Sequence, residues 1–211
     1  MKVLNLYSGI GGNRKLWENV EVTAVEYDPS ISAIYKDYFP DDTMIIGDAH
    51  QYLLDHYKEY DFIWASPPCP THSRIREMGV KIGLHEPLYP DMKLYQEVIF
   101  LDNFFDGKYC VENVKPYYDP LIKPSAKLGR HIFWSNFHIT PKRFSGEAQP
   151  IIHVNASLPR YGFSIEGYKV NQRRDKIMRN LVNPEIGKHV LECAMGNTQI
   201  GMSKFLVGAE Q

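Results

Sequence analysis

Short apolar runs alternate with amphipathic segments over the first two thirds of the chain. The apolar runs predict strands, at residues 2–7, 22–26, 44–46, 61–65 and 108–112, and residues 130–139 also have the pattern of β structure. The segments between them predict helices, at residues 14–19, 30–38, 49–57 and 92–105. Ser30 is expected to cap the second of these helices, and Asn183 with Pro184 to begin a last one, at 186–195. The alternation predicts an α/β fold with a mostly parallel sheet and helices on both faces.

Length and composition favour one intracellular domain. The 211 residues are 44% hydrophobic and 23% charged, so residues 1–211 are expected to form a single domain around one core. The three cysteines have no spacing typical of a disulfide or a metal site, which favours a reducing compartment and no bound metal. No apolar stretch reaches the ~18 residues that a membrane-spanning helix needs. We therefore expect a cytoplasmic protein that does not contact membranes.

A cysteine flanked by prolines follows the strand predicted at residues 61–65. Pro67 and Pro68 can neither continue a helix nor donate to a sheet, so the chain is expected to turn there and present Cys69 at the sheet edge. In parallel sheets, ligands and reactive groups collect at the carboxyl ends of the strands. We interpret Cys69 as a nucleophile; the alternative is a small buried core residue.

A glycine turn and two acidic residues follow the first three predicted strands. The turn Ser8-Gly9-Ile10-Gly11-Gly12 would expose backbone N–H groups to a ligand, but a dinucleotide fingerprint would need glycine in place of Arg14. Glu26 could accept hydrogen bonds from ribose hydroxyls, Asp48 from an adenine amino group, and Tyr27 could stack on a ring. Each acid alone could simply flank a helix. Together, at three successive strand ends, these residues favour an adenosyl cofactor.

The segment Glu112-Asn113-Val114 ends the strand predicted at residues 108–112. A carboxyl group on a strand end beside Cys69 can approach the thiol across the sheet edge. Without Cys69, Glu112 would be interpreted as a helix cap or as the partner of a lysine such as Lys115. The pairing of a thiol with a carboxyl group suggests chemistry on an electrophilic ring.

Taken in order, these motifs resemble those of the DNA (cytosine-5)-methyltransferase family, over residues 2–195. The matching segments are Tyr7-Ser8-Gly9-Ile10-Gly11-Gly12, Glu26-Tyr27, Gly47-Asp48, Pro67-Pro68-Cys69, Glu112-Asn113-Val114 and Asn180-Leu181-Val182-Asn183-Pro184. The resemblance implies a Rossmann-like class I methyltransferase fold, S-adenosyl-L-methionine as cofactor, and C5 of a cytosine in DNA as methyl acceptor. Because C5 and C6 are unreachable inside a duplex, the target cytosine would be flipped out of double-stranded DNA.

The resemblance also implies roles for individual residues. Cys69 would add to C6, Glu112 would contact N3 and the exocyclic amine, and Arg130 would reach the cytosine O2. Cofactor contacts would come from Tyr7, Ser8, Gly9, Ile10, Gly11, Gly12, Glu26, Tyr27, Asp48, Ala49, Pro67, Asn180 and Val182. Substrate contacts would come from Ser73, Arg74, Asn113, Val114 and His131. Residues 70–90 match the position of a mobile loop that closes over DNA.

The chain departs from the family in its recognition region. The family inserts a long variable segment before the terminal Asn-x-Val motif, whereas this chain offers only the short, loop-rich residues 138–179. Basic residues there could bind phosphates: Lys169, Arg173, Arg174, Lys176 and Arg179. Residues 120–165 are also basic, with six lysines and arginines against one acid, although the net charge of the chain is −1. A short target site or a partner protein that supplies recognition would fit this departure.

Three functions therefore compete. The first is an active DNA cytosine-5 methyltransferase, favoured because both catalytic residues and the cofactor positions are present. The second is a related enzyme that modifies RNA or uses a modified cofactor. The third is a non-catalytic nucleic-acid-binding relative, which would need neither Cys69 nor Glu112.

Overall fold

The computed structural model describes residues 1–145 and 159–196, which form a seven-stranded sheet with helices on both faces. The strands are β1 (Lys2–Leu6), β2 (Glu21–Glu26), β3 (Thr43–Ile46), β4 (Phe62–Ala65), β5 (Lys108–Val114), β6 (Ala126–Leu128) and β7 (His131–Ser135). Their order across the sheet is β3-β2-β1-β4-β5-β7-β6. Strands β1 to β5 are parallel, and β7 runs antiparallel to both of its neighbours. The predicted mostly parallel α/β fold is confirmed.

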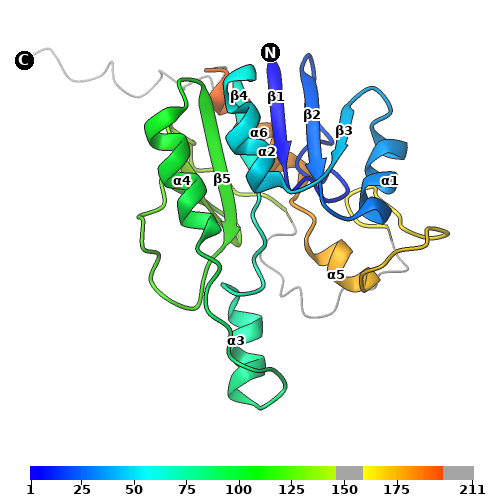
Figure 1. Cartoon of the computed structure of the whole chain (residues 1–211), viewed down its shortest axis with the longest axis vertical. Helices are drawn as coiled ribbons and strands as arrows, with labels where there is room; N and C mark the ends of the chain where they lie inside the picture. The colour runs from blue at the N-terminus through cyan, green and yellow to red at the C-terminus, as the bar shows by residue number, and fades with distance from the viewer. Residues whose placement is uncertain (146–158, 197–211) are drawn as a thin grey trace, which may run out of the picture.

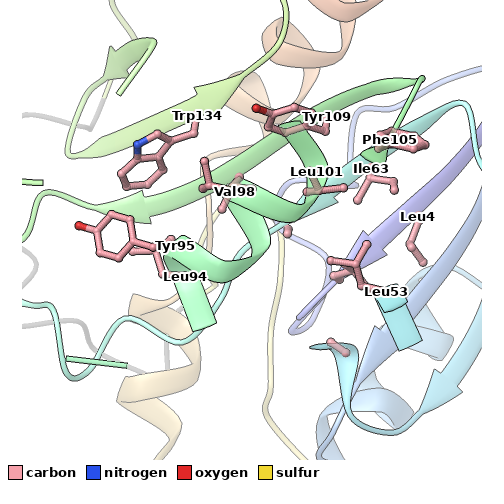
Figure 2. Packing of buried hydrophobic residues seen from close by; sticks show 14 of the residues in the cluster. Leu4, Leu53, Ile63, Leu94, Tyr95, Val98, Leu101, Phe105, Tyr109 and Trp134 are labelled. Atoms are coloured by element: carbon pink, nitrogen blue, oxygen red, sulfur yellow. The ribbon is translucent and has the colours of Figure 1, made fainter. Parts of the chain in front are cut away.

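The strands are buried because alternate side chains serve two different cores. In β4, Phe62 and Trp64 pack on one face, and Ile63 and Ala65 pack on the other. Figure 2 shows the second of these cores, where Leu53 and the side chains of a long helix cover the sheet. A strand whose two faces are both covered has no polar face, which is why residues 62–65 form a continuous apolar run.

The described helices are α1 (Pro29–Tyr38), α2 (Ala49–His56), the 3₁₀ turn η1 (Tyr57–Glu59), α3 (Arg74–Lys81), α4 (Lys93–Phe104), α5 (Arg174–Arg179) and α6 (Pro184–Ala194). In Figure 1, α2 and α4 lie in front of the sheet and α6 lies behind it. Asn183 caps α6, as predicted, because its side chain accepts from the Glu185 N–H. The prediction that Ser30 caps α1 is wrong: the Asp28 carboxylate accepts from both the N–H and the hydroxyl of Ser30.

The prediction of a helix at residues 14–19 is also wrong, because residues 14–16 form turns and residues 17–19 are irregular. The turns run beneath α6, which takes the place of a helix on this face of the sheet. A Cβ at Gly187 of α6 would lie only 2.1 Å from the Asn13 carbonyl oxygen, so glycine permits this close approach. Trp17, 4% exposed, packs in the same core as Ile186 and Val190. Tertiary packing against α6 therefore outweighs the local helical pattern.

Two segments that the sequence predicts as loops contain helices in the structure, α3 and α5. Residues 70–90 include α3, which projects away from the body of the molecule (Figure 1). Of the expected insertion at 138–179, residues 146–158 lie outside the described residues; residues 163–178 pack against α1 through Phe163, Ile165 and Met178. Among the described helices, none is long and apolar enough to cross a membrane.

Candidate active site

A cavity of about 630 Å³ opens at the carboxyl ends of the parallel strands. It lies beside β1 and β4, where the strand order reverses, because the chain leaves β1 toward β2 and returns on its other side to β4. Such a reversal leaves a crevice in which open α/β sheets bind ligands. The walls come from the residues that follow β1 to β4, from the end of β5, from the start of β7, and from the segment at residues 171–182.

The glycine turn after β1 forms one wall. Gly9 has φ +54°, and a Cβ there would meet nothing within 4 Å, so its backbone faces open space. Gly12 packs against residue 182: a Cβ there would lie 2.6 Å from the Val182 carbonyl oxygen, so glycine permits this close approach. Ser8 and Ile10 also line the cavity. Gly11 does not, since its position is fixed by the ring of Phe39, 2.2 Å from where a Cβ would be.

Glu26, at the end of β2, lines the same cavity and is held from two sides. Its carboxylate accepts 3.0 Å hydrogen bonds from the N–H groups of Gly9 and Asp28. Burial raises the pKa of Glu26, although these backbone donors oppose the shift. The neighbouring Tyr27 is 78% exposed at the rim, where its ring faces remain available for stacking.

Asp48 and Ala49 line the cavity at the start of α2. One oxygen of Asp48 caps this helix by accepting from the N–H groups of His50 and Gln51. The other oxygen lies 3.7 Å from the Lys93 ammonium. The interpretation of Asp48 as a helix-flanking acid is therefore confirmed, and the same residue also lines the cavity.

The thiol and the carboxyl group expected to do chemistry line this same cavity. Cys69 follows Pro67-Pro68, and its carbonyl accepts from the N–H groups of His72 and Ser73, which turns the chain into α3. Glu112 of β5 is 5% exposed. Burial and the nearby Glu112 carboxyl raise the pKa of Cys69, while Arg130 and Lys176 act in the opposite direction.

Arg130 lies at the start of β7 and lines the cavity, but its guanidinium also binds backbone. Its Nη2 donates to the carbonyls of Arg179, at 2.8 Å, and Leu181, at 3.2 Å. These carbonyls flank Asn180, which lines the cavity together with Val182. Arg130 thus joins the wall beside Cys69 to the wall formed by residues 180–182.

His131, the next residue, is buried in the cavity wall. Its Nε2 lies 3.7 Å from Glu112 Oε1. Burial, with the Arg130 and Arg160 cations, holds the pKa of His131 well below 6.5. The ring is therefore neutral at physiological pH.

Three of the expected substrate residues do not line the cavity. Asn113 is 2% exposed, and its side chain donates to the Pro67 carbonyl at 2.9 Å, so it links β5 to the Pro-Pro-Cys segment. Ser73 caps α3 through the Arg76 N–H, and Arg74 Nε donates to the Pro116 carbonyl. Val114 does line the cavity.

The sequence did not point to several other lining residues. Asn171 and Gln172 donate to the carboxylate of Asp28 and so hold residues 171–172 at the rim. Ile177 lines the cavity from the same segment, together with Lys176, which the sequence offered as a phosphate-binding candidate, and Leu181, which belongs to the predicted terminal motif. Asn171, Gln172 and Ile177 lie more than 140 positions after Asp28 in the chain, so no local pattern could have connected them to it.

Comparisons with known proteins agree with this architecture. A comparison with curated protein sequences gave no significant match. The chain is similar in structure to the Entamoeba histolytica methyltransferase EhMeth, with a TM-score of 0.54, 12% identity, and coverage of 93% of this chain and 98% of that one. A mutant of Spodoptera frugiperda DNMT2 matches with a TM-score of 0.40 and 24% identity over 57% of this chain, which spans only 37% of that protein's length.

A comparison with models of protein families is more specific than the structural similarities. Residues 1–114, more than half of the chain, match the family model described as C-5 cytosine-specific DNA methylase. The matched range ends at Val114 and so contains the glycine turn, Glu26, Cys69 and Glu112. The chain belongs to the C-5 cytosine-specific DNA methylase family.

Proposed function

We propose that this protein transfers a methyl group from S-adenosyl-L-methionine to C5 of cytosine in DNA. The observation that carries the proposal is that Cys69 and Glu112 line one cavity together with the glycine turn and Glu26. A binding protein without catalytic activity would need an adenosyl site or a basic surface, but not a thiol beside a buried carboxyl group. The proposed reaction uses both, the thiol as the nucleophile and the carboxyl group to polarise the ring.

The cavity wall has the groups that this cofactor requires. The Ser8 hydroxyl is buried on this wall with no hydrogen-bond partner among the described residues, and the Gly9 backbone faces open space. The carboxylate of Glu26 would bind the ribose hydroxyls, the wall at Asp48 and Ala49 the adenine, and Tyr27 would stack on it. Gly12, Pro67, Asn180 and Val182 would enclose the rest. When bound, S-adenosyl-L-methionine supplies a methyl group attached to a sulfonium.

Cys69 and Glu112 would make cytosine reactive. C5 of cytosine is a poor nucleophile, but a bond from the Cys69 sulfur to C6 turns the ring into an enamine whose C5 can take the methyl group. Glu112, as a carboxylic acid, would donate its proton toward N3 and accept a hydrogen bond from the exocyclic amine, which draws electron density from C6. After methyl transfer, a base such as water removes the C5 proton, the C5–C6 double bond re-forms, and the bond between sulfur and C6 breaks to release Cys69. Cys69 lies in the wall of the cavity, so the target base has to leave the duplex to reach it.

The remaining residues would position these groups. Asn113 holds the Pro-Pro-Cys segment against β5, and Val114 and the neutral ring of His131 would shape the base pocket. Arg130 would reach the base from the wall that it shares with residues 180–182. Ser73 and Arg74, at the base of the projecting α3, would contact the DNA backbone outside the cavity.

Substrate scope and setting complete the proposal. The described part of residues 138–179 contains only one short helix, α5, which favours limited sequence readout or a partner protein that supplies it. All three cysteines are free, which favours a reducing compartment such as the cytoplasm.

The proposal is tested by incubating the protein with labelled S-adenosyl-L-methionine and mixed-sequence duplex DNA, followed by nucleoside analysis. We expect labelled 5-methylcytosine with the native protein and none with Cys69→Ser. Cys193→Ser is the matched control, because that thiol is buried between α6 and the sheet, outside the cavity. A parallel incubation with RNA separates the two nucleic acids, and label in RNA alone would refute the DNA assignment.

A trapping experiment tests the covalent step separately. In duplex DNA that contains 5-fluorocytosine, the fluorine at C5 cannot leave as a proton, so the bond between Cys69 and C6 should persist. We expect a DNA adduct on the peptide that contains Cys69. Methyl transfer without such an adduct would show that the reaction does not use Cys69 as a nucleophile.

A further inference from the structure

A buried carboxyl group behind the glycine turn is not used by the proposed chemistry. Glu97 of α4 is completely buried. Its Oε1 accepts a hydrogen bond from the Tyr7 hydroxyl and lies 2.9 Å from Nδ1 of His50. Its Oε2 has no hydrogen-bond partner among the described residues. Burying a carboxyl group is costly, so its presence needs an explanation beyond packing.

The contacts of Glu97 join two walls of the cavity. Tyr7 follows β1 and lines the cavity, and His50 lies in the first turn of α2, next to the cavity residues Asp48 and Ala49. Tyr7 also has φ +56°, a left-handed conformation that is unfavourable for a residue with a side chain. The hydrogen bond from its hydroxyl to Glu97 holds the ring while the backbone turns into the glycine segment. One carboxyl group thus fixes the end of β1 relative to the start of α2.

We propose that Glu97 is a positioning residue for the cofactor. Its carboxyl group holds Tyr7 and His50, and through these two residues it keeps two walls of the adenosyl site at the spacing that S-adenosyl-L-methionine requires. This inference rests on the proposed function of the cavity. Glu97 does not line the cavity and so acts only through these two partners.

The contact with His50 makes this arrangement depend on pH. The hydrogen bond to Glu97 raises the pKa of His50 above 6.5, and burial raises the pKa of Glu97. The other charged groups that shift the pKa values of Tyr7, His50 and Glu97 are Asp48, Asp91 and Lys93. A histidine with a raised pKa contributes most below 6.5 and loses its contribution as the pH rises through the raised value. We therefore expect cofactor affinity to fall as the pH rises above 6.5 and through the raised pKa of His50.

The test measures the dissociation constant of S-adenosyl-L-methionine by calorimetry between pH 6 and 9. The variants are Glu97→Gln, which keeps an acceptor for Tyr7 but loses the charge, and His50→Gln. His56→Gln is the matched control, because His56 lies in the same helix, 2.8 Å from Glu59 Oε1, in an exposed pair. At pH 6.5 we expect Kd to rise roughly tenfold in Glu97→Gln and His50→Gln, as for the loss of a charge-assisted hydrogen bond, and to stay unchanged in His56→Gln.

The pH profile separates positioning from plain structural support. Glu97→Gln and His50→Gln should both lose the rise of Kd above pH 6.5, whereas the native protein and His56→Gln should retain it. A purely structural Glu97 would lower the melting temperature and leave this rise in place, which would overturn the inference. If Glu97→Gln fails to fold, Tyr7→Phe removes a single oxygen and decides the point: a native Kd in Tyr7→Phe overturns the inference. Native protein that binds no cofactor at any pH instead refutes the proposed function.

Discussion

Asn113 offers a direct test of how the thiol and the carboxyl group are held together. Its Nδ2 donates to the Pro67 carbonyl at 2.9 Å, and its Oδ1 accepts from the Val114 N–H at 2.9 Å. The first bond fixes the segment that leads into Cys69 against the strand that carries Glu112. Asn113→Ala removes both bonds. Asn113→Asp keeps the acceptor for Val114, but as a carboxylate it cannot donate to Pro67 and turns a buried negative charge toward that carbonyl.

The magnitude follows from the burial of these partners. The orphaned Pro67 carbonyl and the lost Val114 bond together cost about 2–4 kcal/mol, since a buried unsatisfied group costs more than an exposed one. For a chain of this size, that corresponds to a fall in melting temperature of roughly 4–16 °C. A displacement of Cys69 by about 1 Å would lower the methyl-transfer rate by up to ~10²-fold.

Asn136 provides a matched control at the other end of β5. Its side chain also makes two backbone hydrogen bonds, donating to the Gly107 carbonyl at 2.8 Å and accepting from the Tyr109 N–H at 3.0 Å. This residue is exposed and far along the strand from Glu112. We expect Asn136→Ala to cost about 1 kcal/mol and to leave the rate per folded molecule unchanged.

The assays are thermal unfolding by circular dichroism and single-turnover methyl transfer with saturating cofactor. Asn113→Ala and Asn113→Asp should both lower the single-turnover rate, and Asn136→Ala should not. If Asn113→Ala lowered stability and rate no more than Asn136→Ala does, the Asn113 bond would not be what holds Cys69 near Glu112.

Three further predictions concern the cavity itself. Arg130→Met should raise the Kd of S-adenosyl-L-methionine roughly 5–20-fold, because the carbonyls of Arg179 and Leu181 lose a charged donor, with Arg130→Lys intermediate; an unchanged Kd would show that residues 180–182 need no such support. Because burial raises the pKa of Cys69 above 9.0, its alkylation by iodoacetamide in the absence of substrates should still accelerate at pH 9, and a plateau at lower pH would contradict this. Burial raises the pKa of Glu26 above 4.5, so its carboxylate is protonated at a higher pH than that of a free glutamate. Cofactor affinity should therefore fall on acidification before pH 4.5 is reached. Glu26→Gln should remove this acid dependence.

The sequence predicted the strands and the residues at their ends because both depend on local pattern. A strand with two buried faces appears as a short apolar run, and Pro67-Pro68 ends β4 whatever surrounds it. Cys69 and Glu112 then follow as neighbours because parallel strands end at one edge. This part of the candidate site could be derived from chemistry and order alone.

The features that the sequence missed depend on contacts between distant segments. Residues 14–19 have a helical pattern, but α6 packs so closely at Asn13 that turns replace the helix. The contact between Tyr7 and Glu97 joins residues 90 positions apart. Asn113 was expected to contact substrate, and only the position of the Pro67 carbonyl shows which group it binds. Pairings of this kind have no periodicity and so leave no local signal.

The packing of α6 against the turns at residues 12–16 has a consequence for how the chain is made. A nascent chain that has emerged only as far as β7 has every strand of the sheet, but Trp17, Phe62 and Trp64 still lack the Ile186 and Val190 side chains that cover them. The wall at residues 180–182 is translated just before this helix. Until residues 180–194 have left the ribosome, the cavity lacks one wall and one sheet face is exposed to solvent, a state that favours chaperone binding and aggregation. The complete cavity therefore forms only after α6 has emerged.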